Sequence, residues 1–234
     1  QLYIATGGDG VLRVYHGTTL APATMVKFDS DADNVRYDRA ARRIYVGHGS
    51  GALGAVDTAT NQVVADIALS GHPESFQLEN AGPRIFVNVP GAHQVAMVDR
   101  EKRSTVAKWS LGLTAANYPM TLDEENHRLF VGCRMPARLI VFDTETGKQI
   151  AKLELHGDCD DLFFDAVRRQ IYATCGEGFI DVFAQADADH YALKEAIPTV
   201  AKARTGFFDG DRLYLAVPKR GDDEAEIRCY RVAK

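Results

Sequence analysis

Short apolar runs separated by polar turns recur along the whole chain at an almost constant interval. Each repeat contains a trio in which an aromatic residue stands between two aliphatic or small residues, and the aromatic residues are 42, 41, 44, 42 and 42 positions apart. The six trios are Leu2–Ile4, Ile44–Val46, Ile85–Val87, Leu129–Val131, Ile171–Ala173 and Leu213–Leu215. Six copies at this spacing indicate a repeat architecture in which each copy is one structural unit.

Within a repeat, the pattern predicts four short β-strands, which we name a to d from the axis of the fold outward. Strand a precedes the trio, as in Asn34–Asp38, and strand b carries the trio. Strand c is an alternating run such as Leu53–Asp57, and a polar turn leads into strand d, such as Val63–Leu69. Four-stranded repeats of this length are typical of propeller blades. We therefore expect an all-β fold, a β-propeller of four-stranded antiparallel blades, as a single domain over residues 1–234.

Particular positions of the repeat have structural interpretations. An acid ends every visible strand a, and we expect it to accept hydrogen bonds from backbone N–H groups of the following turn. The c–d turns place Asn61 and Gly147 where a positive φ is expected. The aromatic ring of each trio should pack between adjacent blades, where its burial contributes about 1.5–3 kcal/mol. The acids are Asp38, Glu79, Asp123, Asp165 and Asp209.

The two ends of the chain depart from the repeat. The first repeat lacks a strand a, and the last repeat lacks a strand d. Open strand edges invite aggregation, and propellers usually complete a blade with strands from both termini. We therefore expect an upstream segment of roughly 65 residues, one and a half repeats, that completes a seven-bladed propeller.

The repeats resemble the YncE-like, YVTN-type propeller repeats of bacteria. The segments Tyr45-Val-Gly, Phe86-Val-Asn and Phe130-Val-Gly match the aromatic core of that repeat, and the turn that begins at Asp143 matches its second half. Proteins of this type are usually exported and seven-bladed, so the resemblance implies a periplasmic or secreted protein. It does not select a function, because propellers include binders, lyases, lactonases and scaffolds.

Composition narrows the classes of partner. A net charge of −5 and a pI near 5.8 argue against a nucleic-acid-binding surface, which needs clustered Lys and Arg. The longest apolar runs fall well short of the ~20 residues of a membrane span. A signal peptide is not recognisable, and the chain begins at Gln1.

The four cysteines, at positions 133, 159, 175 and 229, lack the spacing of a zinc site. With Asp165 paired to Gln170 in the fifth a–b hairpin, Asp160 should lie opposite Cys175. Cys159 would then point to the other face of the sheet. We therefore expect four free thiols.

We expect a ligand to bind at the end of the blades where d–a and b–c loops meet around the axial channel, which we call the mouth. Polar groups converge there on a concavity, as in many binding sites. A rim of solvated loop residues around a water-filled channel is the alternative. The candidates are Asp33, Asn34, His48, Glu74, Ser75, Asn88, Tyr118, Arg134, Asp160, Asp161 and Arg204.

Three of these candidates, Asp33, Glu74 and Asp160, hold equivalent positions in three repeats and are the candidates for binding a divalent cation. Their repulsion should raise at least one of their pKa values, unless a cation or Arg204 intervenes. His48 with Asp33 or Glu74 could form a general acid–base pair.

The densest polar cluster is the run His156–Asp161. A His, a thiol and several carboxylates suggest a cation site. Successive strand residues face opposite sides, however, so only one or two of its carboxylates should line the mouth.

Two functions stay open. The sequence contains neither a GxSxG elbow nor an HExxH motif. We favour a non-catalytic, exported propeller that binds a small ligand or a protein at the mouth, without a cofactor. The alternative is a metal-assisted lyase or lactone hydrolase that acts at the same mouth, in which case a divalent cation is expected.

Overall fold

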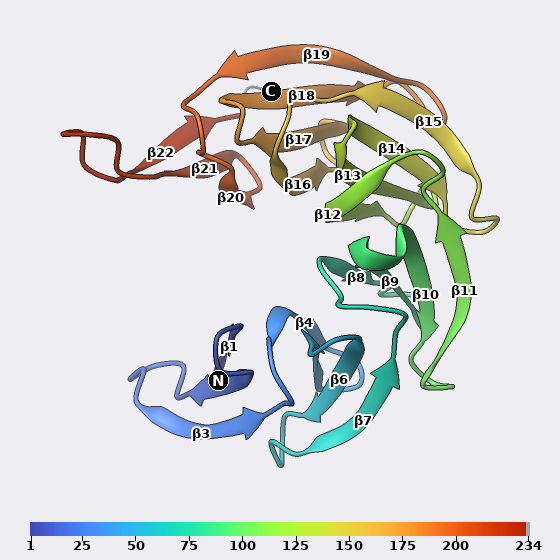
Figure 1. Cartoon of the computed structure of the whole chain (residues 1–234), viewed down its shortest axis with the longest axis vertical. Coiled ribbons are helices and arrows are strands. Elements are labelled where there is room, and N and C mark those ends of the chain that lie inside the picture. The colour runs from blue at the N-terminus through green and yellow to red at the C-terminus, as the bar shows by residue number, and fades with distance from the viewer. Residues whose placement is uncertain (233–234) are drawn as a thin grey trace. The chain divides into compact units, whose positions relative to one another are not determined.

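The computed structural model describes residues 1–232, and most of them lie in β-strands. The strands form six consecutive antiparallel sheets, the blades of a β-propeller, so the predicted fold class is confirmed (Figure 1). The chain divides into two compact units, Gln1–Gly112 (unit 1) and Leu113–Lys234 (unit 2). Each unit contains three blades.

Unit 1 contains blades 1 to 3. Blade 1 has three strands and blades 2 and 3 have four, and one 3₁₀ turn, η1 (Pro90–Ala92), joins β9 to β10. The strands are β1 (Leu2–Thr6), β2 (Val11–Tyr15), β3 (Pro22–Lys27), β4 (Asp33–Asp38), β5 (Arg43–His48), β6 (Ala52–Asp57), β7 (Val63–Ala68), β8 (Phe76–Leu78), β9 (Arg84–Val89), β10 (Gln94–Asp99) and β11 (Ser104–Ser110).

Unit 2 contains blades 4 to 6, of which blade 6 has three strands in the described residues. In each blade the strands follow one another in chain order, as Figure 1 shows for β16 to β19. The strands are β12 (Ala115–Asp123), β13 (Arg128–Met135), β14 (Ala137–Asp143), β15 (Gln149–Glu154), β16 (Cys159–Asp165), β17 (Gln170–Cys175), β18 (Phe179–Gln185), β19 (Tyr191–Pro198), β20 (Thr205–Asp209), β21 (Arg212–Val217) and β22 (Glu226–Arg231).

The trio rings form the centres of the hydrophobic cores. In blades 2 to 5 these rings are almost completely buried, whereas Tyr3 and Tyr214, in the terminal blades, are half-buried. Tyr45 packs in one cluster with Ile85 and Val87 of the next blade. Strand b carries the trio and is buried along nearly its whole length in blades 2 to 5, which explains its continuous apolar run.

Register shifts interrupt the ladders at equivalent places. Every c–d pair has one close to its polar turn, at Val14/Tyr15, Ala55/Val56, Met97/Val98, Val141/Phe142 and Val182/Phe183. Three a–b pairs have one near the start of strand a, at Asp33/Val35, Asn117/Met120 and Cys159/Asp161. One extra residue on one strand changes which side chains share a face.

The shift in blade 5 corrects the predicted register. Cys159, not Asp160, lies opposite Cys175, because the bulge between Cys159 and Asp161 offsets the ladder by one residue. All four cysteines are nevertheless free thiols in the structure. Cys133, Cys159 and Cys175 are buried, and Cys229 is exposed.

Within residues 1–232 we find six blades, and the seventh blade inferred from the strand pattern stays a prediction. No helix of the described residues has the length and apolar character needed to cross a membrane.

Candidate functional site

Four of the predicted mouth residues lie together in unit 2. Tyr118 is in β12, Arg134 is near the end of β13, Asp160 is in β16, and Arg204 immediately precedes β20. Asp158, which belongs to the run His156–Asp161 but was not among the predicted mouth residues, completes the group. We call these five residues the arginine–aspartate cluster.

Each arginine of the cluster contacts both aspartates. The Arg134 guanidinium is 2.5 Å from Asp160 Oδ1 and 3.2 Å from Asp158 Oδ1. Arg204 Nη1 is 2.6 Å from Asp158 Oδ1, and Arg204 Nε is 3.5 Å from Asp160 Oδ2. The side chains are partly exposed, from 20% for Arg134 to 40% for Arg204. Isolated exposed pairs contribute little, but here four alternating charges form one network.

Arg134 is held by two further contacts. Its Nε donates to the carbonyl oxygen of Cys159 at 3.0 Å, and its guanidinium carbon lies 4.3 Å from the centre of the Tyr118 ring, a cation–π contact. Arg204 is positioned through its backbone, since Thr174 Oγ1 donates to its carbonyl oxygen. The hydrogen bond to Asp158 raises the pKa of the Arg204 guanidinium further. Both cations are therefore fixed before any partner arrives.

Local backbone geometry brings the carboxylates together. Asp158 has a positive φ of 59°, and the following bulge separates Cys159 from Asp161 in the ladder. Asp158 and Asp160 meet the same arginines, whereas Asp161 Oδ2 accepts the backbone N–H of Gly206 at 2.8 Å. Two carboxylates of this run thus face the cluster, and the third connects blade 5 to blade 6.

His156, in the same run, has a different partner. Its Nδ1 lies 2.6 Å from Asp181 Oδ1, its backbone N–H donates to Asp181 Oδ2, and its ring stacks on Phe179 with centres 3.9 Å apart. Asp181 is almost fully buried in β18. A carboxylate in the middle of the apolar run Phe179–Phe183 was the sequence signal for this pair. The pair borders a small cavity of about 190 Å³.

The candidates of unit 1 do not form a comparable group of charges. Asp33 is exposed at the start of β4, and Asn34 has a positive φ of 44° at the bulge. The backbone of buried Asn88 pairs with Glu74 and Ser75, through Glu74 N to Asn88 O at 2.9 Å and Asn88 N to Ser75 O at 3.0 Å. Asn88 therefore anchors the start of blade 3.

His48 binds a carboxylate other than the expected Asp33 or Glu74. Its Nε2 lies 2.9 Å from Asp66 Oδ1 of β7, and its ring is 4.4 Å from the Phe28 ring. The buried Nδ1 of His48 has no hydrogen-bond partner among the described residues. The imidazole at the end of β5 thus reaches the outer strand of its own blade.

The proposed cation ligands do not meet as a group within one unit, because Asp33 and Glu74 belong to unit 1 and Asp160 to unit 2. Among the residues that the structure describes, no group of three or more His, Cys, Asp or Glu side chains is arranged to hold a metal ion. Arg204 does contact Asp160, which is the condition under which the expected repulsion is relieved.

Comparison with known proteins gives structural matches alone. Neither a protein-family model nor a curated protein sequence matches the chain. Among solved structures, a chain of the Mitotic Checkpoint Complex has a TM-score of 0.84 and 14% identity, over 97% of this chain and 70% of that one. U3-55K has a TM-score of 0.81 and 10% identity, over 97% and 76% of the two chains.

The WD40 repeats of RRP9 are a third match, with a TM-score of 0.79 and 11% identity, over 98% of this chain and 73% of that one. The fold is common, since 1506 solved chains resemble this one. Identity this low carries no information about function. The likeness shows that the chain has the β-propeller fold, with an architecture similar to that of WD40-repeat structures.

Proposed function

We propose that this chain is a non-catalytic propeller that binds a protein partner through the arginine–aspartate cluster of unit 2. The observation that carries the proposal is the pair of partly exposed guanidinium groups that Asp158, Asp160 and the Tyr118 ring hold in place. Arginine and tyrosine dominate the energetics of many protein interfaces.

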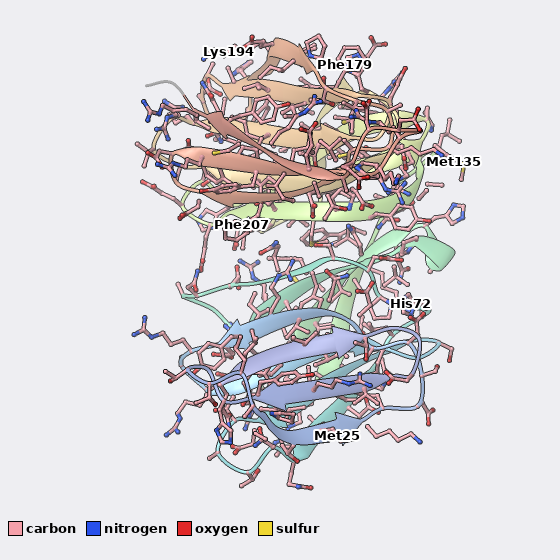
Figure 2. The ribbon with its side chains drawn as sticks, turned by 90° about the vertical axis from the view of Figure 1, so that its left-hand side faces the viewer. Met25, His72, Met135, Phe179, Lys194 and Phe207 are labelled. Atoms are coloured by element: carbon pink, nitrogen blue, oxygen red, sulfur yellow. The ribbon has the colours of Figure 1, made fainter. Side chains whose placement is uncertain are left out.

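Exposed apolar residues are close neighbours of the cluster along the chain and in the β12–β13 ladder. Met135 follows Arg134 directly at the tip of the β13–β14 hairpin and is 62% exposed (Figure 2). Leu113 is 96% exposed and lies two residues before Ala115, the strand partner of Met135. Methionine and arginine are both enriched in protein interfaces. An ion-pair network without apolar neighbours would instead be expected to stay in contact with water. The combination favours a protein partner over a small polar ligand.

Pre-organisation supports the same conclusion. A flexible arginine loses side-chain entropy when it binds, and that loss reduces affinity. Here the loss has already occurred on folding, because Arg134 is fixed by two aspartates, a backbone carbonyl and a ring. A guanidinium has five N–H donors, so donors remain for a partner.

One matched structure is compatible with a role in assemblies, by analogy alone, because it belongs to a complex, the Mitotic Checkpoint Complex. Export to the periplasm or the medium remains part of the proposal on the strength of the family resemblance. The alternative of a metal-assisted lyase or lactone hydrolase, with a cation at Asp33, Glu74 and Asp160, stays a prediction, and no arrangement in the described residues favours it.

The test compares the full chain with Arg134→Ala as immobilised baits in an extract of the source organism. Proteins retained by the wild-type bait are then purified and titrated directly against the wild type and the variant. We expect the substitution to lower the affinity of such a protein about tenfold or more. The control is Arg138→Ala on the next strand, which removes an exposed pair with Glu154 outside the cluster. Equal affinity of wild type and Arg134→Ala for every purified partner would refute the proposal.

A further inference from the structure

A second polar cavity lies in unit 1, at the end of the blades where the a–b turns are found. It is bounded by the a–b turns of blades 2 and 3 and the c–d turn of blade 3, and its volume is about 480 Å³. Small-molecule sites commonly have volumes of ~300–1,000 Å³. The charged and hydroxyl-bearing side chains that line it are Asp38, Arg43, Tyr45, Arg100, Glu101 and Arg103.

One ion pair forms the base of this cavity. Arg100 Nη1 lies 2.8 Å from Asp38 Oδ2, and both side chains are largely buried. Arg100 also donates to the backbone carbonyl oxygens of Glu79 and Gly82, and Asp38 Oδ1 accepts the backbone N–H of Ala41 at 2.9 Å. Both charges are therefore used in holding the two turns together.

The remaining lining charges are predominantly positive. The Arg43 guanidinium lies near the hydroxyl of buried Tyr45, and the exposed Arg103 reaches the carbonyl oxygen of Val64 at 3.3 Å. Glu101 is the acid that remains in the lining besides Asp38. Arg39 and Arg42 lie in the a–b turn that immediately precedes Arg43 and add positive charge. This end of unit 1 is thus basic, although the whole chain has a net charge of −5.

We propose that this cavity binds an oxyanion group, phosphate or carboxylate, of a small molecule, through Arg43 and Arg103. A planar guanidinium presents parallel N–H donors that match the oxygens of either group. The Tyr45 hydroxyl, at the inner end of the cavity, supplies a further polar contact. Since the cavity lies wholly in unit 1, this site is independent of the arginine–aspartate cluster and of the function proposed for it.

The experiment titrates the full chain with inorganic phosphate and, separately, with citrate, while sodium chloride keeps the ionic strength constant. Isothermal calorimetry reads the binding. We expect saturable binding of at least one of the two anions, and their relative affinities distinguish a phosphate site from a carboxylate site. Arg43→Gln and Arg103→Gln should each weaken the binding about tenfold, as for loss of one charge-assisted hydrogen bond.

The matched control is Arg39→Gln, which removes a charge from the same turn outside the cavity lining. Arg39→Gln should leave the affinity for the anion within about twofold of the wild type, because salt in the solution screens exposed charges. Arg103 is exposed, so we expect Arg103→Gln to fold normally. Its affinity for the anions therefore tests the proposed site even if Arg43→Gln is unstable. The proposal is overturned if neither anion binds saturably, or if Arg39→Gln weakens binding as much as Arg103→Gln.

Discussion

The acids that end the strands a illustrate how one side chain acts locally and across blades. As predicted, Asp38, Asp123 and Asp165 accept backbone N–H groups of the following turn, and Asp165 Oδ1 does so from Val167 and Arg168 at 3.0 and 3.1 Å. Some also join two blades, because Asp123 Oδ2 accepts Gln185 Nε2 at 2.8 Å. The local role follows from the turn chemistry, whereas the second partner lies 62 positions away and could not be read from the sequence.

Replacing one of these acids should therefore lower the free energy of unfolding substantially only where the acid is buried. Asp165 also accepts Arg168 Nη1 at 2.7 Å and the Tyr172 hydroxyl at 3.2 Å. In Asp165→Ala these donors lose their acceptor, and we expect urea titration to show a loss of about 2–4 kcal/mol in the free energy of unfolding. Asp209 holds the same repeat position but is exposed, so Asp209→Ala should cost at most ~0.5 kcal/mol. Equal losses would contradict this account.

The thiols should separate into one reactive and three protected groups. Burial raises the pKa of Cys133 to about 11, and a hydrogen bond with Cys175 together with burial raises the pKa of Cys159. A raised pKa keeps a thiol protonated at pH 8, and the protonated form is unreactive. With Ellman's reagent on the native protein we expect one fast thiol, Cys229, and three more only after denaturation. Cys229→Ser should abolish the fast phase, and a fast phase that persists would show another thiol to be accessible.

At the scale of strands, the bulges are what sequence periodicity cannot reveal. The sequence of each strand in a pair shows a continuous apolar pattern, and the extra residue of a bulge does not interrupt that pattern. The c–d pairs all have their shift beside the polar turn, so it is a property of the repeat. In blade 5 an a–b bulge of the same kind placed Cys159 opposite Cys175 and made the predicted register wrong.

The c–d turns offer a direct test of turn chemistry. Gly147 has a φ of 70° and its N–H donates to Asp143 O at 2.8 Å, while Asn61 holds the equivalent position with a φ of 56°. Gly147→Ala should lower the free energy of unfolding by about 1 kcal/mol, because a Cβ is strained at positive φ. Gly147→Asn should lose less. Gly91→Ala, where a Cβ meets no atom within 4 Å, is the control for the glycine substitution itself. Thermal unfolding of the three variants measures the order of their stabilities.

At the scale of the whole molecule, the repeat was sufficient to predict the fold, because the same strand pattern recurs in every complete copy. The arginine–aspartate cluster was predicted only in part. Tyr118, Arg134, Asp160 and Arg204 were selected by their positions in the repeat, but Asp158 lies outside strand a and joins them through its positive φ. His48 was selected too, yet it binds Asp66, since position in a repeat does not determine the direction of a side chain.

Buried tyrosines in both units should make the protein sensitive to alkali. Burial is the main cause that raises the pKa values of Tyr45, Tyr172 and Tyr191, the last to about 12. Their ordinary value is 10.0, so below that pH both states keep the proton and stability is unaffected. Above it the unfolded chain loses the proton and the folded chain keeps it, so the free energy of unfolding falls as the pH rises from 10 to 12.

Urea titrations at pH 9, 10 and 11, roughly spanning the free tyrosine pKa, measure this slope. Tyr172→Phe should make the decline shallower than that of the wild type. A decline of equal slope in the two proteins would assign the alkaline sensitivity to other groups.

The alternation of charges in the arginine–aspartate cluster has a consequence for the speed of recognition. Two guanidinium groups and two carboxylates in mutual contact form an electrostatic quadrupole, whose field decays with distance much faster than that of a single charge. Such a surface does not steer a partner from afar, unlike a patch of one sign. A protein that binds there should associate at an unsteered diffusive rate that barely changes with salt concentration.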